Sequence, residues 1–280
     1  MRAVIFGGTG FLGTSINKFL QNKGFECFIS SYKKKSHFKS NLQSEKKIFN
    51  FLKKTKPEII INCSGEANVD FCNKNFLKAH KSNTLSVRNI VSSVKKLKKT
   101  PYFIQISTDQ IYNSKNTNVE KNINLSNYYS ITKYLGEIEA QNLKNSLIIR
   151  TNFFGKSYSN NRLSFSDYII YNITKKLNVS VPSNIYFNPI HTNHLLDIIF
   201  KLINKKIIGV FNIGSKDYIS KFDFAKKIVL KKKLNAKYLK RFKSDYLIHQ
   251  RPFSTIMSTK KIKSKIKIKL PSVQSGINLL

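Results

Sequence analysis

A strand, a glycine-rich turn and a helix follow one another at the start of this chain, and this order constrains the fold more than any other feature. The segment Ala3–Phe6 is apolar, and apolar residues recur at helical spacing after the turn, which reads Gly7-Gly8-Thr9-Gly10-Phe11-Leu12-Gly13. Glycines in such a turn let the backbone approach a pyrophosphate, which the N-terminus of the helix then faces. The pattern predicts a dinucleotide-binding unit that uses the loop residues Gly7, Thr9, Gly10, Phe11, Leu12 and Gly13.

The alternation of strand and helix continues along the first half of the chain. Helical patterns span about Ser44–Lys54 and Thr84–Lys98, and short apolar runs lie between and after them, at Glu26–Ser30, Ile59–Asn62, Tyr102–Ile106 and Leu147–Arg150. Strands that alternate with helices form parallel sheets, because each return to the same edge needs a crossover. We therefore expect an α/β fold around a parallel sheet.

The end of the second expected strand bears on the choice of cofactor. NAD-selective sites usually carry an Asp or Glu there, which binds the ribose 2′-hydroxyl. Here the chain reads Ser30-Ser31-Tyr32-Lys33-Lys34-Lys35, with no acidic residue. Hydroxyl and ammonium groups suit a 2′-phosphate, so we expect NADPH, with Ser31 and Lys33 as its ligands, and leave NADH open as a second cofactor.

Tyr129 and Lys133 stand four residues apart in a helical pattern. This spacing brings both side chains to one face of a helix. An ammonium group near a phenol favours the phenolate and lowers the pKa of the phenol. Such a tyrosine can give a proton to a carbonyl oxygen or take one from an alcohol. A solvated helix face would show the same spacing, so the pair alone is weak evidence.

Two strand ends offer further candidate ligands. The strand that ends at Asn62 continues into the small residues Cys63, Ser64 and Gly65, which leave room for a bound cofactor. The strand that ends at Ile106 continues into Ser107 and Thr108. A hydroxyl at this edge can hydrogen-bond the same carbonyl oxygen that Tyr129 protonates.

The net charge of the 280-residue chain is +36, which raises the question of nucleic-acid or membrane binding. The lysines are spread over the whole sequence and no aromatic-basic RNA motif accompanies them, so we favour a biased composition and expect no nucleic-acid partner. The sequence contains neither an apolar run of transmembrane length nor a signal-peptide pattern. Three cysteines fit no metal-ligand spacing. We expect a reduced, cytoplasmic protein without stable membrane insertion, and leave a homodimer open.

The C-terminal part gives weaker signals. Ser220, with Asp223 three residues later, is typical of a helix start over Phe222–Leu230. His191 and His194 are spaced for one helix face, but a metal would need more ligands than the nearby sequence offers, so we expect none. From Lys260 to Lys269 isoleucines alternate with lysines and one serine, which fits an amphipathic or an edge segment.

Taken together, these motifs resemble the extended short-chain dehydrogenases/reductases, and among them the dTDP-4-dehydrorhamnose reductase family. The matching segments run in order along the chain: Gly7–Gly13, Ile59–Asn62 with Val69-Asp70, Ser107–Tyr112, Tyr129–Lys133 with Gly136-Glu137, Ile149-Arg150-Thr151, Asn188-Pro189, Gly209–Ile213, Ser220 with Phe224-Ala225, Arg251-Pro252 and Leu270-Pro271.

The resemblance implies a Rossmann-type doubly wound sheet at residues 1–151, with a later contribution from about 189–213, and a smaller α/β substrate domain mainly at 152–280. It implies NADPH-dependent reduction of a nucleotide-linked 4-keto sugar for surface-polysaccharide synthesis. The catalytic trio would be Thr108, Tyr129 and Lys133, the last two also contacting the cofactor. The nucleotide-sugar substrate would meet Thr108, Asp109, Gln110, Asn152 and Arg251, the last of these at the diphosphate.

Several positions depart from the family pattern, and they concern the sugar more than the chemistry. They are Glu66-Ala67, Gln110, Asn193, His194 and Val273. The related 4,6-dehydratases carry Thr-Asp-Glu where this chain has Thr108-Asp109-Gln110, so the second carboxyl for elimination of water is missing. An epimerase of the same fold and a non-catalytic regulatory subunit remain alternatives, the latter disfavoured by the intact Tyr129 and Lys133.

Overall fold

The computed structural model describes residues 1–32, 36–114, 116–159, 163–245 and 251–280. The chain forms two compact units. The first comprises 1–108, 127–150 and 203–210, and the second comprises 109–126, 151–202 and 211–280. Residues 109–126, inside the N-terminal domain expected from the sequence, thus belong to the second unit, whereas 203–210 return to the first.

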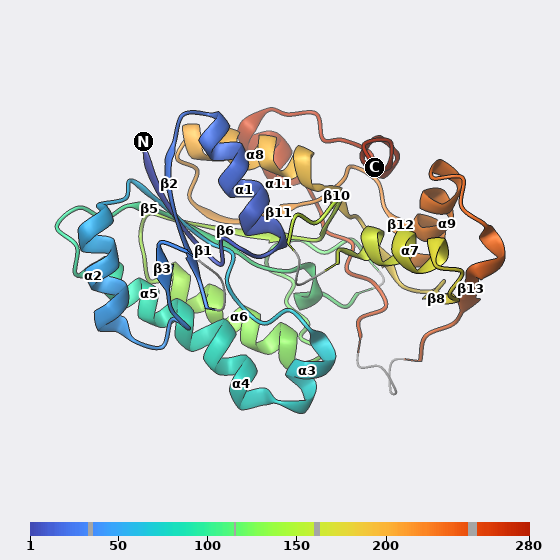
Figure 1. Ribbon diagram of the computed structural model, residues 1–280, viewed down its shortest axis with the longest axis horizontal. Helices are drawn as coiled ribbons and strands as arrows, with labels where there is room; N and C mark the ends of the chain where they lie inside the picture. Colours follow the sequence, from blue (N-terminus) through green and yellow to red (C-terminus); the bar gives the residue numbers. More distant parts are fainter. Residues whose placement is uncertain (33–35, 115, 160–162, 246–250) are drawn as a thin grey trace. The chain divides into compact units, whose positions relative to one another are not determined.

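The largest sheet has seven strands in the order β11-β6-β5-β4-β1-β2-β3 (Figure 1). Its strands are β1 (Arg2–Phe6), β2 (Glu26–Ser31), β3 (Phe38–Lys39), β4 (Ile59–Asn62), β5 (Tyr102–Ile106), β6 (Ser146–Thr151) and β11 (Gly209–Ile213). Strand β1 pairs in parallel with both β2 and β4, and the pairings β2–β3, β4–β5 and β5–β6 are also parallel. Strands β2 and β3 are added on one side of β1 and strands β4, β5 and β6 on the other, so the strand order reverses between β1 and β4, as in doubly wound sheets, which confirms the expected Rossmann-type fold.

Helices cover both faces of this sheet. The helices of the first unit are α1 (Phe11–Asn22), α2 (Glu45–Thr55), α3 (Val69–Lys74), α4 (Phe76–His80), a π-helical turn η1 (Lys81–Leu85), α5 (Ser86–Lys95) and α6 (Tyr128–Gln141). Helix α1 lies on one face, and α2, α5 and α6 lie on the other (Figure 1).

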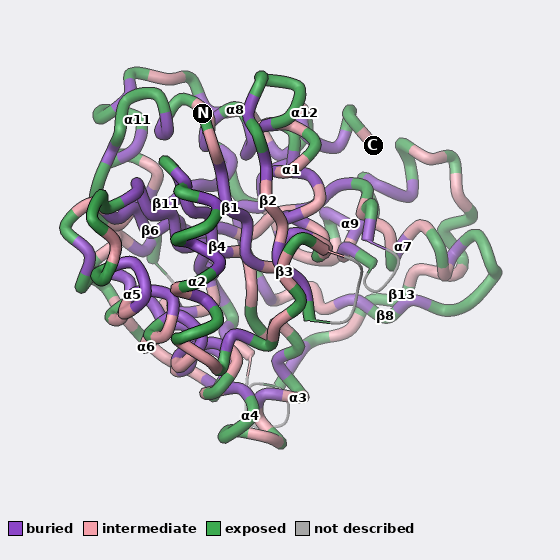
Figure 2. The backbone as a smooth tube through the Cα atoms, turned by 60° about the vertical axis from the view of Figure 1, so that its left-hand side comes forward, coloured by how far each residue is buried: buried purple, intermediate pink, exposed green. Residues whose placement is uncertain are grey.

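Burial on both faces explains why the strands read as continuous apolar runs. In β1 the side chains from Ala3 to Phe6 are completely buried, and in Figure 2 the strand is purple over this stretch. Val4 and Phe6 join one apolar cluster with Ile48 and Phe51 of α2 and with residues of α5 and α6. A strand between two helical layers has no polar face, so the alternation typical of half-exposed strands is absent.

The remaining elements are short. They are η2 (Asp109–Ile111), β7 (Phe153–Phe154), α7 (Phe165–Thr174), β8 (Val179–Pro182), β9 (Tyr186–Phe187), β10 (Ile190–His191), α8 (Thr192–Asn204), β12 (Ile219–Ser220), α9 (Lys221–Lys231), η3 (Ala236–Tyr238), β13 (Leu239–Phe242), α11 (Lys260–Ile266) and α12 (Val273–Ile277). Three two-stranded sheets pair β10 with β7, β12 with β9, and β13 with β8. Phe224 of α9 packs edge to face against Phe154 and Phe187, at the centre of the apolar core of the second unit.

One sequence prediction for this region is confirmed, and one of the two alternatives for the tail is observed over Lys260–Ile266. Ser220 caps α9, because its hydroxyl oxygen accepts the backbone N–H of Asp223 at 3.0 Å and its hydroxyl donates to the Asp223 carboxylate at 2.6 Å. The lysine- and isoleucine-rich tail forms the amphipathic helix α11, in which Ile262 and Ile266 are buried one turn apart and the lysines are exposed.

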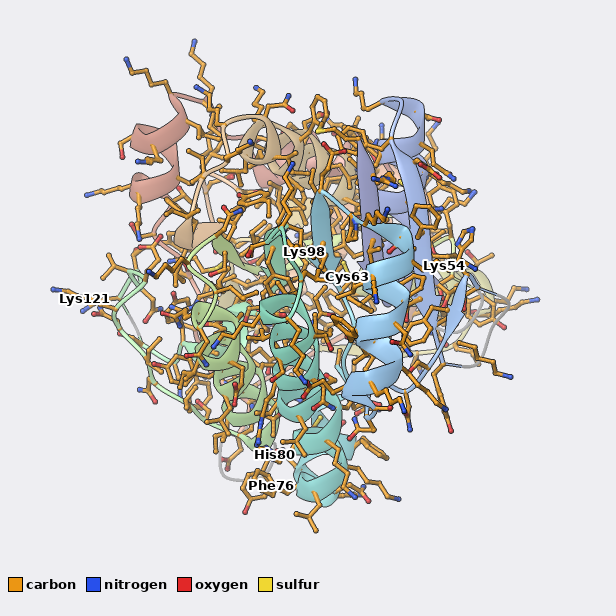
Figure 3. All side chains as sticks on the ribbon, turned by 90° about the vertical axis from the view of Figure 1, so that its left-hand side faces the viewer. Lys54, Cys63, Phe76, His80, Lys98 and Lys121 are labelled. Carbon is orange, nitrogen blue, oxygen red and sulfur yellow. The ribbon has the colours of Figure 1, made fainter. Side chains whose placement is uncertain are left out.

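Most of the lysines that the structure describes are surface residues. Lys54 on α2 and Lys98 after α5 are exposed, and Figure 3 shows blue-tipped side chains extending outward across this view of the chain. Within the described residues, no helix has both the length and the apolar character that a membrane crossing needs.

Candidate active site

The glycine turn after β1 has the shape that a pyrophosphate needs. Gly7 has φ of +74°, and a Cβ on it would lie 2.8 Å from both the Cα and the backbone N of Ser64. A Cβ on Gly13 would lie 2.2 Å from the carbonyl oxygen of Gly7. Gly10 precedes α1 and has no side chain to cap it, so the first N–H groups of the helix can bind phosphate oxygens. The turn therefore fits a dinucleotide, with Phe11, Leu12 and Gly13 in the first turn of the helix.

One hydrogen bond joins this turn to the end of β2. The hydroxyl of Thr9 donates to the hydroxyl of Ser31 at 2.8 Å. Ser31 is buried, whereas the next residue, Tyr32, is exposed. The structure thus brings Ser31 beside the glycine turn, where the sequence predicted a ligand for the 2′-phosphate, while the predicted ligand Lys33 lies outside the described residues.

The residues that follow β4 lie next to the glycine turn. The Asn62 amide donates to Gln105 of β5 at 2.9 Å, and its oxygen accepts both the N–H and the hydroxyl of Ser64. These bonds fix the turn through Cys63 to Gly65. Burial raises the pKa of the Cys63 thiol to about 12, with Lys133 opposing the shift, so this thiol stays protonated at neutral pH.

A capping box fixes where helix α6 begins. The Asn127 side chain accepts the N–H of Ser130 at 2.8 Å, and the Ser130 hydroxyl accepts the N–H of Asn127 at 3.2 Å, which closes a capping box. With the start of the helix fixed, Tyr129 and Lys133 are both buried with 8% exposure, whereas Tyr128 is 47% exposed. The two predicted residues therefore share the buried side of the helix.

The ammonium group of Lys133 lies at the carboxyl edge of the sheet. Its Nζ donates to the carbonyl oxygen of Ile106, the last residue of β5, at 2.9 Å. Burial lowers the pKa of Lys133, although the carboxylate of Glu137 and the thiols of Cys63 and Cys72 oppose this effect. Thr108 follows two residues after Ile106 and is also buried, so the first unit carries all three predicted catalytic residues.

Asn83 is a part of this site that the sequence reading missed. It lies in the π-helical turn η1 and is buried. Its amide oxygen accepts the N–H of Glu66 at 2.8 Å, and its amide nitrogen donates to the Glu66 carbonyl at 3.0 Å and to the Thr132 hydroxyl at 3.1 Å. One carboxamide thus holds the loop after β4 against the helix of Tyr129 and Lys133. A π turn leaves no distinct residue pattern, so periodicity gave no signal for it.

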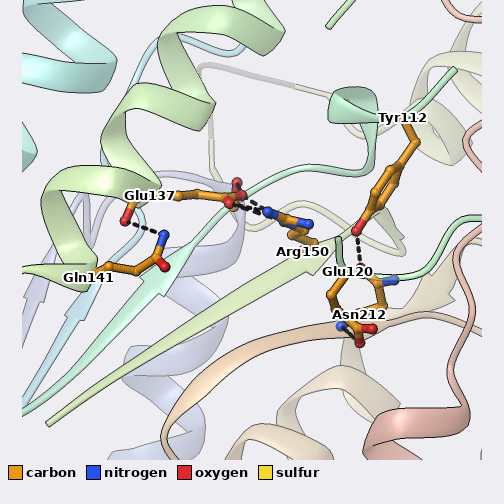
Figure 4. A network of polar contacts seen from close by, with 7 residues as sticks. Tyr112, Glu120, Glu137, Gln141, Arg150 and Asn212 are labelled. Carbon is orange, nitrogen blue, oxygen red and sulfur yellow. Dashed lines mark hydrogen bonds and ion pairs between the residues drawn. The ribbon is translucent and has the colours of Figure 1, made fainter. Parts of the chain in front are cut away.

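A buried ion pair joins helix α6 to strand β6. Glu137 and Arg150 are 0% and 3% exposed, and Arg150 Nη2 lies 2.6 Å from Glu137 Oε2 while Arg150 Nε donates to both carboxylate oxygens (Figure 4). The hydroxyl of Ser107 also donates to this carboxylate. Three elements therefore meet at one carboxylate, namely α6, β6 and the strand end that leads to Thr108.

The predicted substrate residues other than Thr108 belong to the second unit. Asp109 is buried, and its Oδ2 accepts the Asn152 amide at 2.9 Å and the Thr255 hydroxyl at 2.5 Å. Gln110 and Arg251 are partly exposed. The structure thus joins Asp109 to Asn152 and adds Thr255, which the sequence did not indicate.

A second set of hydrogen bonds, also drawn in Figure 4, holds the segment after Gln110 in place. The buried Tyr112 donates its hydroxyl to Asn212 at 2.8 Å, and the N–H of Asn212 donates to Glu120 at 3.1 Å. These contacts hold residues 109–126 to β11 within the second unit.

The two spaced histidines are a packing pair. Their rings lie 6.1 Å apart, and Nδ1 of His191 accepts the N–H of Asn193 at 3.2 Å. Burial lowers the pKa of His191 to about 4, and His194 adds to this shift. Across the described residues, no group of three or more His, Cys, Asp or Glu side chains has an arrangement that could hold a metal ion.

Comparison with known proteins gives a family match over the whole chain. The family described as the RmlD substrate binding domain matches residues 1–280. Among curated proteins, the Spore coat polysaccharide biosynthesis protein SpsK of Bacillus subtilis is 22% identical over 232 residues, which cover 81% of this chain and 78% of the relative.

Solved structures also match from end to end. A hypothetical dTDP-4-dehydrorhamnose reductase from Sulfolobus tokodaii is 26% identical, with a TM-score of 0.85 and 99% of each chain covered. The dTDP-4-dehydrorhamnose reductase from Bacillus anthracis, solved in complex with NADP, is 22% identical, with a TM-score of 0.87 over 99% of this chain and 96% of that one. At 22% identity the latter likeness shows the fold, and it agrees with the resemblance found in the sequence.

Proposed function

Since this chain belongs to the RmlD substrate binding domain family over its whole length, we propose that it reduces the 4-keto group of a nucleotide-linked sugar with NADPH. The chain is an NAD(P)-dependent oxidoreductase of the short-chain dehydrogenase/reductase type. The observation that carries the proposal is the buried pair Tyr129 and Lys133 on one side of α6, in the same unit as the glycine turn and Thr108.

In this proposal the side chains of the chain manage the proton while a bound nicotinamide supplies the hydride. Tyr129 gives its phenolic proton to the oxygen that becomes an alcohol. Lys133 stabilises the tyrosinate that remains, because an ammonium nearby favours the charged phenolate. Thr108 donates a hydrogen bond to the carbonyl oxygen and so polarises it. The glycine turn and the N-terminus of α1 bind the pyrophosphate of the cofactor.

The test of this function is a substrate panel. The protein is incubated with NADPH and each of several nucleotide-linked 4-keto sugars, and the absorbance of the reduced cofactor is followed. We expect oxidation of NADPH that depends on one of these sugars. Oxidation with none of them, by a protein that binds NADPH, would refute the proposed reaction.

The product is expected to be heavier than the substrate by two hydrogen atoms. Gln110 stands where the dehydratases have a second carboxyl, and an amide can act as neither the acid nor the base of an elimination. Mass spectrometry of the sugar nucleotide distinguishes the alternatives. Loss of the mass of one water molecule would indicate a dehydratase, and an unchanged mass with altered stereochemistry would indicate an epimerase.

NADPH is expected to bind more tightly than NADH, and Ser31→Asp is expected to reverse this preference. Ser31 hydrogen-bonds Thr9 in the glycine turn, so a carboxylate there would repel a 2′-phosphate and accept a 2′-hydroxyl. A repulsion of about 1.4 kcal/mol would weaken NADPH about tenfold. Fluorescence titration of both cofactors measures this, with Ser31→Ala as the neutral control. Tighter binding of NADH to the wild-type protein would contradict the assignment.

The cellular role that we propose is the supply of a reduced sugar nucleotide for surface-polysaccharide synthesis in the cytoplasm. The likeness to the spore coat polysaccharide protein supports this role.

A further inference from the structure

Lys221 differs from almost every other lysine of this chain in its surroundings. Of the lysines that the structure describes, all are exposed except Lys133, Lys221 and Lys232. Lys133 belongs to the catalytic helix, and Lys232 donates to the main-chain oxygen of Leu280. Lys221 is partly buried at the first position of α9, whereas most of the described lysines are exposed to water. Its partial burial therefore suggests a specific role for its charge.

Backbone pairing brings Lys221 into the neighbourhood of Arg251. Strand β9 pairs with β12 on one side, and the N–H of Lys221 donates to Ile185 at 2.9 Å. On its other side, Tyr186 of β9 bonds the segment that follows Arg251, through Phe253 at 2.8 Å and Thr255 at 3.0 Å. The start of α9 and the segment from Arg251 to Thr255 therefore flank the same short strand within the second unit.

The charges at this place are predominantly positive. Burial and, to a smaller extent, the Arg251 guanidinium lower the pKa of Lys221 to about 8, against the opposing effect of the Asp109 carboxylate. Asp109 already accepts hydrogen bonds from Asn152 and Thr255. Two neighbouring cations, held in part away from water, form a site for an anion, because an anion relieves the repulsion between them.

We propose that Lys221 and Arg251 together bind the diphosphate of the nucleotide sugar. This inference rests on the proposed function and assigns a second cation to a group for which the sequence indicated only Arg251. Arg251 offers two parallel N–H donors and Lys221 a point charge, and together they match the several oxygens of a diphosphate. A carboxylated sugar presents the same kind of oxygen, so the test must separate the two sources of negative charge.

The test measures binding of dTDP, dTMP and thymidine by isothermal titration calorimetry without any sugar or reduction. A lost hydrogen bond to a charged group predicts that Lys221→Met weakens dTDP binding about 10- to 100-fold. Binding of dTMP should fall less, and that of thymidine should not change. Lys226→Met is the matched control, because it removes the same charge from an exposed position of the same helix and should leave dTDP affinity within about twofold.

Other results of these experiments would support or overturn this inference. Lys221→Arg should restore most of the affinity for dTDP, which excludes misfolding as the cause of the loss. Equal losses for Lys221→Met and Lys226→Met would overturn the inference, since only the total charge would then matter. Unchanged dTDP binding together with weaker binding of glucuronate, which carries a carboxylate and no phosphate, would overturn it in favour of a carboxylate site. A wild-type protein that binds NADPH but neither dTDP nor UDP would refute both this inference and the proposed function.

Discussion

Replacing Tyr129 by phenylalanine is expected to lower kcat by about 10²–10⁴-fold, the typical contribution of a general acid, while NADPH binding stays close to wild type. The ring remains in its buried place on α6, so packing against Val69, Cys72 and Ala79 should survive. What the variant lacks is the proton for the forming alcohol. Stopped-flow measurement of NADPH oxidation gives kcat, and fluorescence titration gives cofactor affinity.

Tyr128→Phe is the internal control for this experiment. Tyr128 precedes Tyr129 but is 47% exposed, and its ring lies 5.0 Å from that of Phe76 on α4. About 100° separates consecutive residues on a helix with ~3.6 residues per turn, so Tyr128 faces another direction and its variant should retain most activity. Loss of activity in Tyr128→Phe alone would contradict the helix register. Full activity in both variants would favour the regulatory-subunit alternative.

Arg150→Met is expected to lower the free energy of unfolding by about 3–5 kcal/mol, because it leaves the Glu137 carboxylate buried without its counter-ion. Glu137 is completely buried and takes hydrogen bonds from Arg150 and Ser107. The remaining hydroxyl donor cannot balance a full charge in that environment. Urea denaturation followed by circular dichroism measures the loss.

Two comparisons make this prediction specific. Arg88→Met changes an exposed arginine on α5 of the same unit, and its effect should stay within about 0.5 kcal/mol. The double variant Glu137→Gln with Arg150→Met should recover part of the loss, because position 137 then carries no charge that lacks the guanidinium and the amide oxygen can still accept from Ser107. If Arg150→Met proves as stable as Arg88→Met, the buried pair does not support the edge of the sheet.

The local part of the fold could be predicted from neighbouring residues. The apolar run before Gly7 predicted β1, and the run Tyr102–Ile106 predicted β5 with its bounds as the structure has them. Tyr129 and Lys133 share a buried helix side because Asn127 and Ser130, three residues apart, fix where α6 begins. Helix periodicity, caps and strand runs are set by residues close in sequence, so one sequence suffices to read them.

The order of the strands followed from a resemblance, and the structure provides its physical basis. A βα turn with Gly7 in a positive-φ conformation allows β4 to pack directly beside β1, which places Ser64 against the glycine. The sequence of the turn indicated the close approach of the backbone, but not which strand would make it.

Contacts between distant residues were decided by the tertiary structure alone. Asp109 receives a hydrogen bond from Thr255 far along the chain, and Asn83 reaches both Glu66 and Thr132. The spacing of residues in the sequence predicts none of these hydrogen bonds. A polar residue has the same place in the sequence whether its side chain bonds to water or to a buried carboxylate. The sequence by itself determined where the main strands and helices of the first unit lie and that Tyr129 and Lys133 stand one helical turn apart. Only the tertiary structure decided which polar groups are buried next to one another, because this depends on which surfaces of the helices and strands pack together.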